Sequence, residues 1–288
     1  MSFDLYFHSR TQPQFQTRDL EEYFRRLNTF TVQQEEDRIH FHYNNEDTWV
    51  YCTFSFPRSG IGRTNHEPIE FRLNYNRPIS FPCETFPLVE LFCEQFDLLV
   101  EDLQEETIEQ VNVGRLVDSW RVHNVGAVQA LAATGMKLHY FPESKTVEWW
   151  RYARARQQIE EVLLQDMFVP TMVFLQTPDN LLFRMIVFPE VAGKLLPPSD
   201  YVWIQRRSIR GETETGLVRY EELIDRIGPY LNDYEAFGAT VKYLSAANAL
   251  SVVPIIRKLD LQPVDLSTYT GFPANGFHNV ELNTELSI

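Results

Sequence analysis

The sequence has few of the features that mark secreted or membrane-bound proteins. Its three cysteines, Cys52, Cys83 and Cys93, show no CxxC or Cys/His ligand spacing, which predicts reduced thiols and excludes a disulfide framework. No run of about 18 uncharged apolar residues occurs, so a membrane-spanning helix is not expected. The opening MSFDLYFHSR lacks the basic start of a signal peptide. These absences predict a cytoplasmic protein that makes no contact with a membrane.

Basic residues are also scarce. The chain has 26 basic residues against 40 acidic ones, a net charge of −14, and only 5 of the basic residues are lysines. A field of this sign repels nucleic acid and attracts basic proteins. The 21 arginines favour planar, bidentate pairing with carboxylates. We therefore expect a basic protein partner and no nucleic-acid partner.

The residues that are present predict a folded core. The chain has 288 residues, of which 44% are hydrophobic and 14% aromatic, and it contains no low-complexity run. That length accommodates two domains of ordinary size.

The first part of the chain alternates strand and helix patterns. SFDLYFH has the period of two that indicates a strand with one buried face, and residues 19–28 have helical spacing with Asp19 at their start. Residues 37–57 predict a hairpin, and IEFRLNY predicts a further strand. A helix follows with Val89, Phe92 and Phe96 on its apolar stripe and Glu84 off it, and DLLV closes the pattern. This order predicts a ferredoxin-like split βαβ domain with one added strand over residues 1–104.

Residues 105–288 predict a second, mixed α+β domain. A helical connector with a break at residues 124–126 precedes a helix in TVEWWRYARARQQIEEVLLQD. VPTMVFLQ and LLFRMIVFP predict an antiparallel hairpin, DYVWIQRRSI a strand, and VRYEELIDRIGPYL a helix. The tail from residue 262 onward predicts irregular structure that lies over the surface. The fold class is therefore α+β.

No motif in the sequence specifies a catalytic or metal site. His40 and His42 lie two apart on a predicted strand and point to one face, but no third ligand follows at a telling spacing. Gly60 and Gly62 lie in a loop without the strand before it and the helix after it that a phosphate site requires. We predict no catalytic residue, no metal and no cofactor.

Acidic clusters and Trp/Arg pairs are the candidate partner-binding residues. A strand-to-helix junction dense in like charge is more often solvated than catalytic, whereas exposed carboxylates speed the capture of a basic partner. The acidic positions are Glu35, Glu36, Asp37, Glu46, Asp47, Glu101, Asp102, Glu105 and Glu106. Tryptophan and arginine are enriched at interface hot spots, which adds Trp149, Arg151, Trp203 and Arg207 as anchors.

The segments SFDLYF and FCEQFDLLVEDLQ together resemble the N-terminal ferredoxin-like domain of a loose group of bacterial cytosolic proteins. Several members of that group are immunity proteins paired with polymorphic or type VI secreted toxins. The group has Asp-Pro-Gln where this chain has Asp102-Leu103-Gln104. The resemblance implies an inhibitor without an active site, which binds a cognate toxin or effector, such as a nuclease, in a fixed ratio.

Two other functions stay open at this point. One is an enzyme or small-ligand sensor whose site assembles from dispersed residues, and another is an adaptor or chaperone that loads an effector onto a secretion system. Homodimer formation also stays open as a question of partners. RNA binding is disfavoured, because TWVYCTFSF lacks the basic and glycine positions of the RNA-recognition signature.

Overall fold

The computed structural model describes residues 2–10, 15–58, 69–163, 167–189, 192–207, 211–236 and 238–281. The chain divides into two compact units, one from residues 1–140 with 275–288 and one from residues 141–274. Each unit combines helices with sheet, which confirms the predicted α+β class. The division lies further along the chain than the boundary expected after residue 104, because the helix α3 (Val113–Ala133) packs against α2 (Ser80–Phe96) of the first unit.

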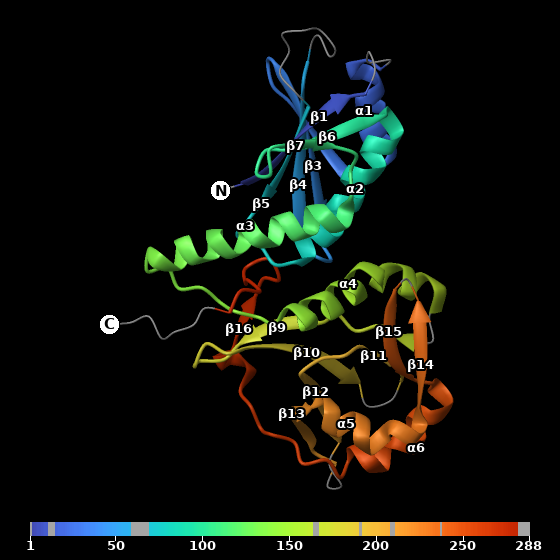
Figure 1. Ribbon diagram of the computed structural model, residues 1–288. Helices are drawn as coiled ribbons and strands as arrows, with labels where there is room; N and C mark the ends of the chain where they lie inside the picture. The colour runs from blue at the N-terminus through green and yellow to red at the C-terminus, as the bar shows by residue number, and fades with distance from the viewer. Residues whose placement is uncertain are drawn as a thin grey trace. The chain divides into compact units, whose positions relative to one another are not determined.

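The first unit is built on a seven-stranded sheet with the order β2-β3-β4-β5-β1-β6-β7 (Figure 1). Its strands are β1 (Ser2–Ser9), β2 (Phe30–Gln34), β3 (Arg38–Asn45), β4 (Val50–Pro57), β5 (Ile69–Asn74), β6 (Leu98–Asp102) and β7 (Thr107–Glu109). β1 lies between β5 and β6 and is antiparallel to both, and α2 connects these two outer strands. The predicted split βαβ arrangement is therefore present.

The meander between the first two helices of this unit has four strands, where the sequence predicted three. α1 (Thr17–Arg26) leads into β2, which pairs with β3 from Phe30↔Tyr43 to Gln34↔Ile39. β2 was missed because only its first residue is half-buried and the other four are exposed, so it lacks a strand's apolar alternation. α1 itself begins two residues earlier than expected, with the Asp19 carboxylate accepting a hydrogen bond from the Gln16 backbone N–H at 2.7 Å.

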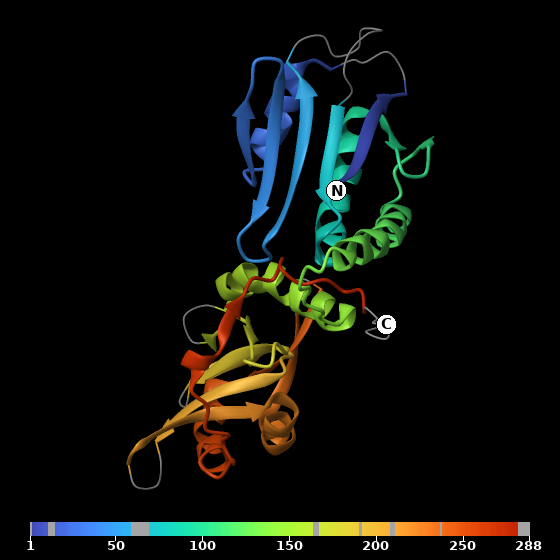
Figure 2. The same ribbon diagram turned by 90° about the vertical axis from the view of Figure 1, so that its left-hand side faces the viewer.

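Aromatic side chains fill the core between this sheet and its helices. α1 and α2 lie on the same face of the sheet (Figure 2), the face to which β1 directs Phe3, Leu5 and Phe7. The ring of Phe24 on α1 lies 4.6 Å from that of Phe41 on β3 and 5.5 Å from that of Phe92 on α2, measured between centroids. Aromatic contacts at these separations add to the stabilisation from apolar burial.

Glu84 on α2 is buried, although it lies off the apolar stripe that the sequence predicts for this helix. Its Oε1 accepts hydrogen bonds from the hydroxyls of Tyr43 at 2.7 Å and Thr48 at 2.9 Å and from the Asn45 side-chain amide at 2.8 Å. All three donors come from the end of β3 and the turn that follows it. The carboxylate therefore fixes this turn to the helix.

Within the described residues, the second unit combines two sheets with α-helices (Figure 1). One sheet has the order β13-β12-β10-β9-β16 and the other β14-β15-β11-β8. The elements are α4 (Glu143–Leu163), β8 (Met167–Phe168), β9 (Val173–Gln176), β10 (Leu182–Pro189), β11 (Gly193–Leu196), β12 (Tyr201–Arg207), β13 (Thr213–Arg219), α5 (Tyr220–Ile227), β14 (Leu231–Ala236), β15 (Ala239–Leu244), α6 (Ala246–Ile256) and β16 (Thr270–Phe272). The predicted hairpin is confirmed, since β9 and β10 pair antiparallel.

One prediction about residues 105–288 is wrong, and another is right only in part. α3 is continuous through the expected break at residues 124–126, because the buried Asn124 donates its side-chain amide to the backbone carbonyl oxygen of Tyr75 instead of ending the helix. The tail is mostly irregular and exposed, as predicted, but parts of it pack into the fold. It adds β16 to the edge of β9, and Ala274, Phe277 and His278 are buried. Asn279 then accepts a hydrogen bond from the Ile79 N–H at 2.7 Å, at the start of α2.

Candidate functional site

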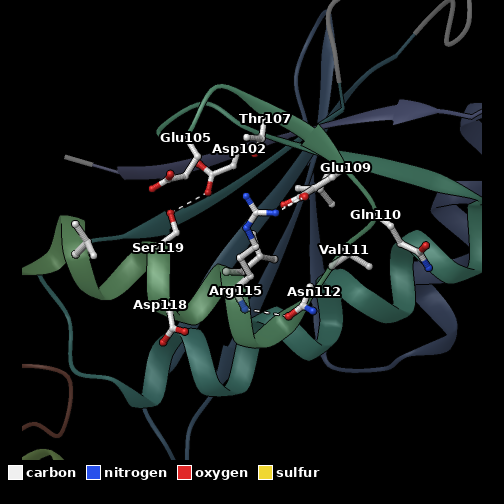
Figure 3. Close-up of a pocket in the computed structure, with 13 residues that line it drawn as sticks. Asp102, Glu105, Thr107, Glu109, Gln110, Val111, Asn112, Arg115, Asp118 and Ser119 are labelled. Carbon is white, nitrogen blue, oxygen red and sulfur yellow. Dashed lines mark hydrogen bonds and ion pairs between the residues drawn. The ribbon is translucent and has the colours of Figure 1, made fainter.

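The candidate site is a cavity of about 240 Å³ between the β6–β7 hairpin and α3 of the first unit (Figure 3). Apolar side chains form part of its wall: Val100, Val111, Leu116 and Val122. Polar side chains form the rest: Asp102, Glu105, Thr107, Glu109, Gln110, Asn112, Arg115, Asp118 and Ser119. Four carboxylates thus face the cavity against one cationic side chain.

Local sequence explains how the hairpin and the helix meet at this point. The Asp102 carboxylate accepts a hydrogen bond from the Gln104 backbone N–H at 2.9 Å, an Asx turn that reverses the chain after β6. Glu106 adopts a φ of 53°, which lets β7 return antiparallel to β6. Asn112 then caps α3 by accepting from the Arg115 N–H at 3.0 Å.

Polar contacts inside the cavity join the hairpin to the helix. Ser119 on α3 donates its hydroxyl to Asp102 at 2.9 Å, and Arg115 pairs with Glu109 (Figure 3). Asp102 is only 5% exposed. Its carboxylate is therefore committed to structure and is too deeply buried to steer a partner, which corrects its predicted role. The Ser119 hydroxyl is hydrogen-bonded to a carboxylate and not to an imidazole, which is the group that would activate it as a nucleophile.

The rim of the cavity is more accessible than its floor. Glu105 and Glu106 in the hairpin turn are exposed, and Asp118 on α3 has a side chain that is 75% exposed. Glu101 on β6 does not line the cavity; it is half-buried and pairs with His8 at 2.6 Å. The rim therefore presents a negative surface above an apolar wall.

The other predicted acidic clusters lie elsewhere on the same sheet. Glu35, Glu36 and Asp37 are exposed in the turn from β2 to β3. Glu46 is exposed and Asp47 half-buried in the turn from β3 to β4. Since β3 and β6 run parallel within the sheet, the 46–47 turn and the 103–106 turn share one sheet end, whereas the 35–37 turn is at the opposite end. Four strand spacings, about 19 Å, separate β3 from β6.

The predicted tryptophan anchors are largely in the core. Trp149 is 3% exposed and its ring lies 5.1 Å from that of Phe174, so it cannot act as a surface anchor. Helix α4 instead leaves Trp150 half-buried, where Arg154 lies over its ring at 5.7 Å. Trp203 is half-buried against the cluster of Phe183, Met185 and Leu217.

The two predicted arginine anchors are at the surface of the second unit. Arg207 is exposed at the end of β12. Arg151 is exposed on α4 and lines a separate hollow of about 560 Å³. Both arginines therefore remain accessible to a partner.

His40 and His42 share one face of β3, as their spacing predicts, with ring centroids 6.1 Å apart. Each imidazole Nδ1 is bonded to a hydroxyl of β4, His40 to Ser55 at 2.7 Å and His42 to Thr53 at 3.1 Å. Burial, and then the neighbouring His40, lower the pKa of His42. Within the described ranges no three histidine, cysteine or acidic side chains are grouped to hold a metal ion. Gly60 and Gly62 lie outside the described residues.

Sequence reasoning missed the α3 side of the cavity. Arg115, Ser119 and Val122 follow one another at helical spacing on α3. Asn112 at the start of that run was the available signal, since asparagine is a preferred N-cap. Nothing in the sequence indicates that this helix meets β6, because Ser119 and Asp102 are 17 residues apart.

Comparison of the chain with protein-family models, with curated proteins and with solved structures finds no match. None of the described helices has both the length and the apolar composition that crossing a membrane requires.

Proposed function

We propose that the chain is a cytoplasmic binding protein that neutralises a basic toxin or effector by stoichiometric contact, as its resemblance to immunity proteins implies. The observation that carries the proposal is the negative rim above the apolar wall of the cavity between the β6–β7 hairpin and α3. The net charge of −14 supports it, because a negative field raises the rate at which a basic partner arrives.

The cavity is suited to a lysine or arginine side chain of the partner. Such a side chain has an apolar stem and a cationic head. The stem would contact Val111, Leu116 and Val122, and the head would remain at the rim beside Glu105 and Asp118. Glu105 and Asp118 already take part in exposed pairs, with His123 at 3.9 Å and with Arg121 at 3.2 Å, and such solvent-screened contacts can be exchanged for a partner's cation. Asp102 and Ser119 are hydrogen-bonded to each other and stay in place.

The first experiment is capture of partners from the native cytosol on the tagged chain, followed by identification by mass spectrometry. The proposal expects a basic protein whose activity falls to zero as the chain reaches a 1:1 ratio. An adaptor would leave the captured effector active at that ratio, and capture of a metabolite alone would indicate an enzyme or sensor. Either result would overturn the proposal.

Charge reversal then tests the rim. The double variant Glu105→Lys with Glu106→Lys should slow association with the captured partner by about tenfold or more at low salt, because steering depends on local charge. Increasing salt should reduce the difference in association rate between the variant and the wild type. The matched control is Glu221→Lys with Asp225→Lys, two exposed positions on α5 that give the same change in net charge. Equal effects of the two variants would show that only total charge matters and would remove the rim from the proposal.

A further inference from the structure

The edge strand β2 differs from every other edge strand that the structure describes. The three sheets end in β2 and β7, in β13 and β16, and in β14 and β8. β13 and β14 contain charged residues, and β7, β16 and β8 are three residues long or shorter. β2 reads FTVQQ, five residues without a charge or a proline. Short length, charge and proline are the usual protections of an edge against pairing with another chain, and β2 has none of them.

The backbone groups of β2 that no described strand pairs can be assigned from its hairpin. The Glu35 N–H donates to the Arg38 carbonyl oxygen at 2.9 Å, which makes 35 and 38 a hydrogen-bonded pair. Hydrogen-bonded pairs alternate with non-hydrogen-bonded pairs along an antiparallel ladder. Thr31 and Gln33, which lie four and two residues before Glu35, therefore direct their N–H and C=O groups toward β3. Phe30, Val32 and Gln34 therefore direct theirs away from the sheet. Val32, at the centre, has a residue exposure of 39%.

The two ends of β2 carry opposite charges. Arg25 and Arg26 precede it at the end of α1, with side chains that are 60% and 74% exposed. They also pair within the helix with Glu21 and Glu22, contacts that are weak at such exposure. The exposed Glu35–Asp37 turn follows β2 directly. An antiparallel second copy would bring its acidic turn to the basic end of the first copy, and its basic end to the acidic turn of the first. A two-fold interface requires this self-complementarity.

We propose that two copies of this chain form a homodimer by antiparallel pairing of β2 with β2 around a two-fold axis at Val32. In this register Phe30 is opposite Gln34 of the second copy, and the outward groups of residues 30, 32 and 34 form about six hydrogen bonds. The acidic turn of each copy then lies beside residues 27–29 of the other, next to Arg25 and Arg26. The sheets of the two first units become one continuous sheet.

We assign a second copy of the chain as the partner of β2, because a second copy places an opposite charge beside both the acidic and the basic end of this strand. A strand from a basic partner would match only the acidic turn. The contact is small, so we expect a dissociation constant on the order of micromolar. The net charge of −14 on each copy opposes association, and the measurement therefore belongs at physiological ionic strength.

The test is sedimentation equilibrium of the full chain from about 1 to about 200 µM, a range that spans the expected dissociation constant. The wild type should approach twice its mass of 33.9 kDa. Val32→Lys should raise the dissociation constant at least about tenfold, because two like charges meet at the axis. The matched control is Ile108→Lys, an exposed apolar residue on the other edge strand, β7, which should leave the dimer unchanged. Circular dichroism and thermal unfolding would check that both variants fold.

Cysteine cross-linking tests the register. Val32→Cys should give a disulfide-linked dimer under mild oxidation, since residues in a directly opposed hydrogen-bonded pair have Cα atoms about 5.5 Å apart, within the span of a disulfide. Ile108→Cys should stay monomeric on a non-reducing gel. A monomeric wild type, a dimer that Val32→Lys does not weaken, or a failure of Val32→Cys to cross-link would overturn the inference. If the wild type is monomeric but Val32→Lys weakens capture of a basic partner, the edge pairs with that partner's strand instead.

Discussion

Each unit contains a carboxylate that is fully or largely removed from solvent, and the two carboxylates are held in different ways. In the first unit Glu84, 1% exposed, accepts hydrogen bonds from two hydroxyls and an amide. In the second unit Asp200 accepts from the backbone N–H of Arg184 at 2.8 Å and pairs with Lys145 at 2.6 Å. The Arg184 guanidinium, with a side chain only 3% exposed, also pairs with Asp200, at 3.4 Å. The Asp200 side chain is 14% exposed.

The type of hydrogen-bond partner determines how each carboxylate contributes to the stability of its unit. Burial, and then the Glu84 carboxylate, raise the pKa of Tyr43, which keeps the phenol protonated as a donor. Glu84 therefore stabilises a turn by means of groups that carry no charge at neutral pH. Burial works to raise the pKa of Asp200, but hydrogen bonds from Lys145 and the Arg184 backbone and the charges of both residues outweigh it and hold the pKa below its usual value. Its contribution is therefore sensitive to pH.

The largest effect is expected from Glu84→Ala. The substitution leaves Tyr43, Asn45 and Thr48 without their common acceptor, and each buried donor left unsatisfied costs about 1–3 kcal/mol. We expect the free energy of unfolding of the first unit to fall by about 3 kcal/mol or more, measured in urea. Native-state hydrogen exchange should quicken first in the turn at residues 46–49.

Glu94→Ala is the matched control, because Glu94 lies on the same helix and is exposed. It should change the unfolding free energy by less than about 0.5 kcal/mol. Similar losses in the two variants would contradict a specific role for the Glu84 contacts.

The buried carboxylates Glu84 and Asp102 show which features of the structure the sequence could not predict. The period of two in SFDLYFH gives β1 its buried face, and the split βαβ order follows from short-range patterns of this kind. Burial of Glu84 and Asp102 could not be predicted, because a carboxylate is normally exposed. Their donors Thr48 and Ser119 are 36 and 17 residues away. The acidic rim was predicted by residue type, whereas the cavity beneath it depends on how α3 meets the hairpin.

Asp200→Asn should have an intermediate effect. It removes the negative charge beside the buried Arg184 guanidinium but keeps an oxygen acceptor, and we expect a loss of about 1–3 kcal/mol at pH 7. The lowered pKa of Asp200 means that its contribution is present above the unfolded pKa of about 3.9 and is lost as pH falls through the folded value. The difference in unfolding free energy between the wild type and Asp200→Asn should therefore decrease toward low pH. A difference that is the same at pH 7 and pH 3 would contradict this account.

Lys145→Ala should have the smallest effect and separates the two cations around Asp200. Lys145 is 46% exposed, so its pair with Asp200 is screened by solvent, and its removal should cost less than about 1 kcal/mol. Arg184 remains to satisfy the carboxylate, through its backbone N–H and its guanidinium. High salt should reduce the small loss further. If Lys145→Ala destabilises the second unit as much as Asp200→Asn does, the exposed lysine, and not the buried arginine, is the main partner of Asp200. The contrast with Glu84 would then rest on an exposed ion pair.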